Sequence, residues 1–104
     1  MYQIKMTYAE WLGRRHNEIA TFELFFRVAP FKGKFAVFSG HDEVISFLRN
    51  YRFTPEHIAY LKQTIPQAKE EFFQWLQSLD CKSIKVEGAL DGELVFPDEP
   101  LLRI

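Results

Sequence analysis

One stretch constrains the fold of this 104-residue chain more than any other. Residues 20–28 read Ala-Thr-Phe-Glu-Leu-Phe-Phe-Arg-Val, and their side chains alternate in character. Because successive side chains of a strand point to opposite faces, this pattern predicts a half-buried β-strand. We expect one face to carry the core and the other to meet water or a polar partner. The expected core face consists of Ala20, Phe22, Leu24, Phe26 and Val28.

The remaining elements follow from local signals. Pro30 ends the first strand, and Gly33 supports a turn into a second strand at 35–38. Helices are predicted at 3–15 and from Asp42, as the cap, to about Arg49. A short helix is predicted from Thr54-Pro55, and a stronger helix follows it to about Leu79. Further strands are expected at 83–86 and 93–96, on either side of an Asp91-Gly92 turn, and at 101–104. These elements predict one α+β domain over residues 1–104, an antiparallel sheet packed with helices.

Composition excludes several classes of partner. The formal net charge of -1 argues against a general nucleic-acid surface, which needs a basic excess. No apolar run approaches the length of a membrane span, and the N-terminus lacks the apolar core of a signal peptide, so we expect no membrane partner. The single Cys81 excludes an internal disulfide and fits a reducing compartment. A cytoplasmic protein is predicted.

No complete catalytic or metal-binding set is evident. His16, His41 and His57 lie far apart, with no carboxylate or Cys at ligand spacing, which favours surface or capping roles over metal binding. Glycine-rich phosphate loops, nucleophile elbows and zinc signatures are absent from the sequence. We therefore predict no catalytic residue and no metal site within these residues.

Arg27 is the charged residue that the pattern singles out. It lies near the end of a strongly apolar strand, on the face opposite the expected core. An ion pair with Glu23 and a site for an anion such as phosphate are equally compatible with this position. Tyr2, by pattern alone, is a terminal aromatic that packs on its helix.

Read in order, these motifs resemble the N-terminal domain of nicotinate phosphoribosyltransferase, a type II phosphoribosyltransferase. The resemblance covers nearly the whole chain, and its most specific part is the phenylalanine-rich strand with an Arg-x-x-Pro-Phe tail. The residues that carry it are Tyr2-Gln3, Tyr8, Trp11, 22–27, 30–35, 79–81, 94–97 and 100–102.

The resemblance implies an enzyme of NAD biosynthesis. It would join nicotinate to phosphoribosyl pyrophosphate, giving nicotinate mononucleotide and pyrophosphate, with ATP and Mg²⁺ as cofactors of the parent enzyme and none bound to these residues alone. The catalytic histidine and the phosphoribosyl pyrophosphate pocket belong to a C-terminal α/β barrel, which residues 1–104 do not contain. The resemblance also implies a homodimer whose active sites are shared across the interface, and an inactive fragment when these residues stand alone.

Two substrate-binding residues carry over by resemblance. Tyr2 matches the tyrosine of an Asp-x-Tyr motif whose ring stacks on the pyridine ring in the partner subunit. Arg27 matches the arginine that approaches the ribose-bound phosphate. Lys32 departs from the family pattern, because glycine is common there, and so does the 90–92 turn. These departures concern loop geometry.

Two alternatives remain open at this point. One is a freestanding interaction domain of the same fold without catalysis, and the other is a fragment of nicotinamide phosphoribosyltransferase. The abrupt helix at the N-terminus and the strand at the C-terminus suggest a truncated chain. We expect such a chain to expose aromatic side chains and its last strand, residues 101–104.

Overall fold

The computed structural model describes residues 2–104, and their contacts group the chain into two compact units. The helical unit contains the residues up to Ile19 together with Tyr51–Asp80. The sheet unit contains Ala20–Asn50 and Cys81–Ile104. The chain therefore passes between the units three times, and each unit is built from two separated segments.

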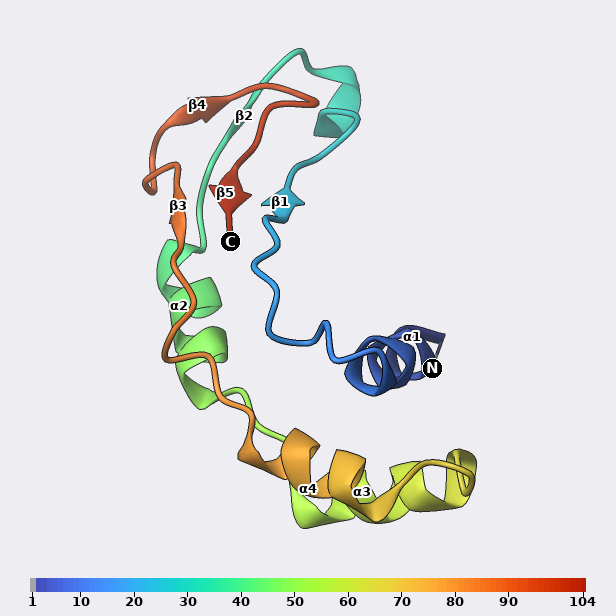
Figure 1. Ribbon diagram of the computed structural model, residues 1–104. Helices are drawn as coiled ribbons and strands as arrows, with labels where there is room; N and C mark the ends of the chain where they lie inside the picture. Colours follow the sequence, from blue (N-terminus) through green and yellow to red (C-terminus); the bar gives the residue numbers. More distant parts are fainter. Residues whose placement is uncertain (1) are drawn as a thin grey trace. The chain divides into compact units, whose positions relative to one another are not determined.

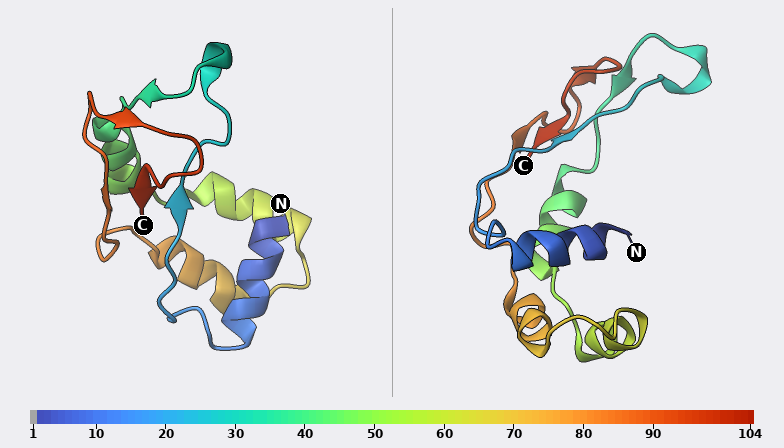
Figure 2. Two further views of the ribbon diagram at one scale, coloured as in Figure 1. Left: turned by 90° about the horizontal axis from the view of Figure 1, so that it is seen from above. Right: turned by 45° about the vertical axis from the view of Figure 1, so that its right-hand side comes forward.

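Three helices form the helical unit: α1 (Tyr2–Leu12), α3 (Pro55–Thr64) and α4 (Glu70–Ser78). Figure 2 shows α1 lying against the α3–α4 pair. The buried core consists of Ile58, Leu61, Ile65, Phe72, Phe73 and Leu76. Helix α1 adds Ile4, Tyr8 and Trp11 to this core, and the Tyr8 ring lies 4.8 Å from that of Phe72 between centroids. The spacing of three and four residues at the last helix predicts an apolar stripe of Ala68, Phe72, Trp75, Leu76 and Leu79, and this stripe is confirmed, with Phe73 as an additional buried member.

The helix ends follow local chemistry. Thr54 caps α3, as predicted: its hydroxyl accepts from the His57 N–H while the His57 ring accepts from the Thr54 N–H. A side-chain hydrogen bond from Thr54 to the Glu56 carboxyl holds the pKa of that carboxyl below its usual value. Helix α1 ends at Leu12 and not at residue 15 as predicted, and Arg14 takes the left-handed conformation, with φ 59°. The Arg15 N–H then donates to the Glu10 carbonyl, as in a Schellman motif.

The sheet unit contains five short strands, one helix and one 3-10 turn (Figure 1). The strands are β1 (Glu23–Leu24), β2 (Ala36–Val37), β3 (Glu87–Gly88), β4 (Leu94–Val95) and β5 (Leu102–Arg103), with η1 (Pro30–Lys32) and α2 (His41–Asn50) between β1 and β3. They form a three-stranded sheet in the order β1-β5-β3 and a β2-β4 pair, antiparallel throughout. The predicted α+β class with antiparallel pairing is confirmed.

Two local predictions are wrong. No strand forms at 83–86, because β3 lies at Glu87–Gly88 and pairs with β5, while β4 pairs with β2. The Asp91-Gly92 turn instead supports α2. Its Asp91 Oδ1 accepts from the Gly40 and His41 N–H groups at 2.9 and 3.0 Å, so Asp91, and not Asp42, caps this helix.

The expected core face of the first strand is not buried. Phe22 is 71% exposed, Leu24 47% and Val28 80%, and only Phe26 packs against the core of the sheet unit. That core centres on Phe38, Val95 and Leu102, which come from β2–α2, β4 and β5. The first strand is an edge strand, and the sheet unit leaves most of its apolar face exposed.

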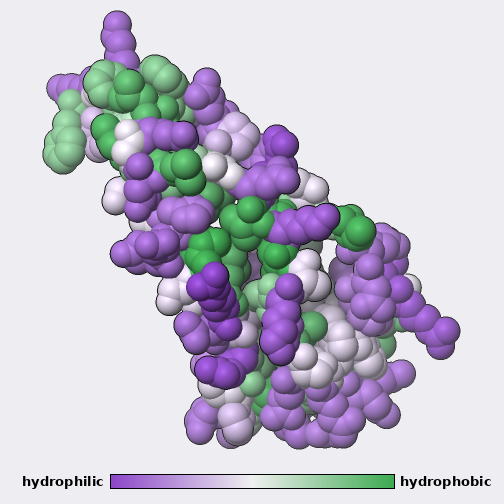
Figure 3. All heavy atoms as spheres, turned by 90° about the vertical axis from the view of Figure 1, so that its left-hand side faces the viewer, coloured by the Kyte–Doolittle hydropathy of each residue, from purple (hydrophilic) through white to green (hydrophobic). Residues whose placement is uncertain are grey.

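The last strand also differs from expectation. We predicted that residues 101–104 would be exposed, but β5 is the middle strand of its sheet and Leu102 is fully buried. The other part of that prediction is confirmed, because several aromatic side chains are exposed, among them Phe22, Phe31 and Phe35. Figure 3 shows hydrophobic residues reaching the surface among hydrophilic ones. Within residues 2–104, no helix has both the length and the apolar character needed to cross a bilayer.

Candidate functional site

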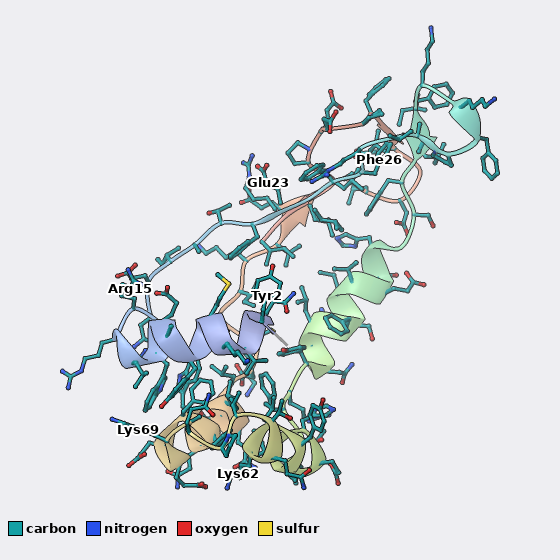
Figure 4. All side chains as sticks on the ribbon, turned by 90° about the vertical axis from the view of Figure 1, so that its right-hand side faces the viewer. Tyr2, Arg15, Glu23, Phe26, Lys62 and Lys69 are labelled. Carbon is teal, nitrogen blue, oxygen red and sulfur yellow. The ribbon has the colours of Figure 1, made fainter. Side chains whose placement is uncertain are left out.

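Tyr2 is the first residue of α1. Its side chain is 66% exposed, and Figure 4 shows it on the side of α1 away from α3 and α4. Tyr8 and Trp11 provide the aromatic packing of this helix against the core. The interpretation of Tyr2 as helix packing is therefore not supported within the helical unit, and its ring is available for another contact.

Arg27 lies in the sheet unit, just beyond β1. The backbone around it is fixed: the Phe26 carbonyl accepts from the Asp98 N–H at 2.8 Å, and Ala29 is buried. The Arg27 side chain is exposed, and within residues 2–104 it forms neither an ion pair nor a hydrogen bond. A rigid backbone thus carries an unpaired guanidinium group. Tyr2 and Arg27 belong to different units, and each is positioned only within its own unit.

The alternative of a Glu23–Arg27 ion pair is wrong. Glu23 stands opposite Arg103 in the β1–β5 register, and the Arg103 guanidinium contacts Glu23 Oε1 at 3.0 Å. Glu23, the β1 member of this ion pair, is labelled in Figure 4. Because Glu23 is paired across the sheet, Arg27 keeps its charge available for an external anion.

Sequence reasoning missed the segment that follows Arg27. We call residues Arg27–Phe35 the turn segment; it runs from the end of β1 through η1 toward β2 and stands at one end of the sheet unit in Figure 1. Besides Arg27 it carries Lys32 and Lys34, both exposed, and the Phe31 side chain has an exposure of 101%. One signal could have revealed it: no acidic residue occurs between Glu23 and Asp42.

The backbone of the turn segment is unusual. Phe31 and Lys32 both have φ 57°, a left-handed conformation that L-residues adopt at a cost of roughly 1–2 kcal/mol each. The turn closes through the Gly33 N–H, which donates to the Pro30 carbonyl at 3.0 Å. A tight turn in this strained geometry presents Phe31 and the lysines to solvent.

The three histidines have structural positions. His57 completes the α3 cap, and the His41 N–H donates to Asp91. The His16 ring packs edge-on against Trp75 at 5.1 Å between centroids, and its Nδ1 is buried without a hydrogen-bond partner. A cavity of about 680 Å³ near His16 is lined by Trp11, Leu12, Arg14, His16, Asn17, Lys69 and Glu71. Tyr2 is not among its lining residues.

The residues in hand do not fit a Mg²⁺–ATP site. Among residues 2–104 no three His, Cys, Asp or Glu side chains gather as metal ligands. We derive no step through ATP or Mg²⁺ from these residues.

Comparisons with known proteins agree along the whole chain. It matches the family described as nicotinate phosphoribosyltransferase (NAPRTase) N-terminal domain over residues 1–104. A nicotinate phosphoribosyltransferase of Dictyostelium discoideum is 41% identical over 104 residues, which is 100% of this chain and 18% of that protein. Nicotinate phosphoribosyltransferase 2 of Arabidopsis thaliana is 39% identical, over 100% of this chain and 19% of that protein.

A solved structure gives the same result. The crystal structure of human nicotinic acid phosphoribosyltransferase superposes with a TM-score of 0.88 at 37% identity, covering 98% of this chain and 21% of that chain. The chain thus spans about a fifth of the length of the relatives that it matches. Sequence and fold agree, and the chain belongs to the nicotinate phosphoribosyltransferase N-terminal domain family.

Proposed function

We propose that residues 1–104 are the N-terminal domain of a nicotinate phosphoribosyltransferase whose catalytic α/β barrel follows them. The observation that carries this proposal is the match of the whole chain to the family, with 37% identity and a TM-score of 0.88 to the human structure. The parent enzyme would convert nicotinate and phosphoribosyl pyrophosphate into nicotinate mononucleotide and pyrophosphate in NAD biosynthesis, with ATP and Mg²⁺ as cofactors. It would act as a cytoplasmic homodimer.

In this proposal Arg27 binds the phosphate of phosphoribosyl pyrophosphate. Its exposed guanidinium has no internal partner among the described residues, and it is held on a fixed backbone, so binding would leave no internal charge unpaired. A charge-assisted hydrogen bond to phosphate contributes about 1.5–3 kcal/mol. Arg27→Ala should therefore raise the Michaelis constant for phosphoribosyl pyrophosphate much more than that for nicotinate, at unchanged thermal stability.

Tyr2 would stack on the pyridine ring of nicotinate in the partner subunit. Its exposed ring at the start of α1 supports this role, since stacking needs an accessible face. Loss of the ring in Tyr2→Ala should raise the Michaelis constant for nicotinate, at a cost of roughly 0.5–1.5 kcal/mol for ring stacking. Tyr2→Phe keeps the ring face and should be much milder. Unchanged nicotinate kinetics in Tyr2→Ala would remove Tyr2 from the site.

Mixed dimers test whether the site is shared between subunits. Chains carrying Tyr2→Ala are combined with chains that lack the barrel histidine. If Tyr2 acts across the interface, at most one of the two sites retains both an intact Tyr2 and an intact barrel. If no site of the mixed dimer has wild-type nicotinate kinetics, a shared site is excluded, because Tyr2→Ala and the intact barrel then lie in the same site.

The decisive experiment is to express the full reading frame and measure product formation. We expect nicotinate mononucleotide to form from nicotinate and phosphoribosyl pyrophosphate, faster with ATP and Mg²⁺, and poor turnover of nicotinamide. Preferential use of nicotinamide would contradict the substrate assignment. A stop codon directly after Ile104 would contradict the enzyme assignment and leave a freestanding binding domain.

A further inference from the structure

We propose that Lys32 and Lys34 bind the pyrophosphate group of the substrate together with Arg27, so that the turn segment contacts two phosphates and not one. We call these three side chains the clamp. This inference rests on the proposed function and extends it to residues for which the family resemblance gives no role. Its elements are three unpaired cations in one nine-residue segment, a strained backbone turn within that segment, and a local deficit of acidic groups.

Charge is the first element. Arg27, Lys32 and Lys34 are exposed, and none of the three forms an ion pair or a hydrogen bond among residues 2–104. Other cations of the chain do have partners: Arg15 contacts Glu10 at 2.9 Å, and Lys62 contacts Glu70 at 2.6 Å. Unpaired cations that share one segment repel each other, and a multivalent anion relieves that repulsion.

Reach is the second element. Lys32 and Lys34 are two residues apart, so their Cα atoms are separated by at most about 7 Å. Each side chain is long and flexible and ends in an ammonium group with three donors. Both ammonium groups can therefore contact the oxygens of one diphosphate. Arg27, five residues before Lys32 in the same segment and without an internal partner in the described chain, can add a planar pair of donors.

Backbone strain is the third element. Two consecutive residues, Phe31 and Lys32, hold left-handed φ angles of 57°, and neither is glycine. Strain of this kind persists where the surrounding structure enforces it, and it concentrates at ligand-binding segments. Here Ala29 is buried and the Gly33 N–H closes the turn onto the Pro30 carbonyl, so the segment is anchored while its charged side chains stay free.

The nearest acids by backbone pairing lie on the opposite strand connection. The Asp98 N–H donates to the Phe26 carbonyl, which brings Asp98 and Glu99 toward the base of the turn segment. Neither carboxylate contacts Arg27, Lys32 or Lys34 in an ion pair. The clamp thus keeps its positive charge, and Asp98 offers a way to increase it. Asn tolerates the left-handed φ of 63° at this position, so Asp98→Asn removes the charge with little disturbance.

The test uses the full-length enzyme with a double variant, Lys32→Gly and Lys34→Gln. Glycine suits the left-handed turn, so the fold should be kept while both charges are lost. Lys85→Gln, an exposed lysine of the sheet unit, is the matched control. We expect the Michaelis constant for phosphoribosyl pyrophosphate to rise about tenfold or more in the double variant, consistent with loss of charge-assisted bonds. The constant for nicotinate should match the control, and the melting temperature should be no lower than that of the control, because glycine relieves the left-handed strain at position 32.

Asp98→Asn should act in the opposite direction and lower the phosphoribosyl pyrophosphate constant about two- to threefold, because it removes a nearby competing charge. Equal constants in the double variant and the control would overturn the clamp. If instead the double variant loses its dimer in sedimentation at an unchanged constant, the lysines bind an acidic protein surface and the clamp is likewise wrong.

Titration with inorganic pyrophosphate separates failure of the clamp from failure of the proposed function. If the full-length protein binds pyrophosphate and the double variant does not, the clamp stands even without turnover of nicotinate. If turnover is present and Arg27→Ala impairs it while the double variant does not, the proposed function stands and the clamp fails. Absence of pyrophosphate binding in the wild-type protein overturns the clamp directly.

Discussion

The two units of this chain bury their apolar residues to very different degrees. The helical unit packs its stripe from α3 and α4 around Phe72, which is 0% exposed, and α1 covers the remainder. The sheet unit leaves its most apolar strand uncovered, with Phe22 71% exposed. Phenylalanines of equal hydrophobicity therefore differ in role. In the helical unit Phe72 and Phe73 hold the fold, whereas in the sheet unit Phe22, Phe31 and Phe35 form an exposed surface for a further contact.

The largest expected effect comes from exchanging one phenylalanine in each unit. Phe72→Ala should destabilise the 104-residue chain by about 3–5 kcal/mol, because it empties a fully buried site. Phe22→Ala should change stability by less than about 0.5 kcal/mol, because that ring faces water. Urea unfolding measures both. Equal losses of stability in the two variants would contradict the difference between the units. A larger loss for Phe22→Ala in the full-length protein than in the isolated chain would support it, since another part of the full-length protein would then cover the Phe22 ring.

A pair of glycine substitutions tests packing of the sheet against packing of the helices. A Cβ at Gly88 would lie 2.2 Å from the Leu101 carbonyl oxygen and 2.8 Å from the Leu102 Cα, so β3 and β5 must separate. Gly88→Ala should cost about 1–3 kcal/mol. Gly13→Ala is the control in the helical unit, because its Cβ would meet nothing closer than 3.4 Å. Thermal unfolding that ranks the two variants in the reverse order would contradict this account.

Part of this difference between units was predictable from the sequence. The α3 start at Thr54-Pro55 and the apolar spacing of α4 depend on residues within one or two turns, so local patterns identify them. The sheet unit depends on distant partners. Nothing near Glu23 indicates that Arg103 will pair with it, and nothing near α2 indicates its cap at Asp91.

Prediction of the candidate site from the sequence is limited in the same way, because it also depends on distant partners. The position of Arg27 beyond an apolar strand was visible in the sequence, but its freedom from Glu23 follows only from the β1–β5 register. The apolar side chains of β1 likewise stay exposed because little of the sheet unit packs over that face, although the alternation along the strand is sound. Alternation predicts two faces, and it does not determine which face another element will cover.

Removal of the distant helix cap should have an intermediate effect. Asp91→Ala deprives the Gly40 and His41 N–H groups of their acceptor and should cost about 0.5–2 kcal/mol. Asp91→Asn keeps an oxygen acceptor and should cost less. Hydrogen exchange of the first α2 amides measures the effect locally, with α3 amides as the internal reference. Equal protection of α2 in all three proteins would show that Asp91 is not its cap.

The smallest effect is expected to be stabilising and to lie in the helical unit. Arg14 ends α1 in the left-handed conformation, which glycine adopts without strain. Arg14→Gly should therefore raise stability by about 0.5–1 kcal/mol. Arg15→Gly removes an ion pair and no strain, so it should not stabilise the protein. A loss of stability in Arg14→Gly would indicate that the Arg14 side chain makes a contact that matters more than the strain.

The central position of β5 has a consequence for the order in which the chain folds. During synthesis, β1 emerges from the ribosome before its partner strand β5, which follows some eighty positions later in the register Glu23↔Arg103. The helical unit is complete once Asp80 has emerged. A nascent chain therefore carries finished helices beside an unpaired phenylalanine-rich strand, a state that favours aggregation or chaperone binding. Translation pauses between codons 80 and 104 would prolong that exposure.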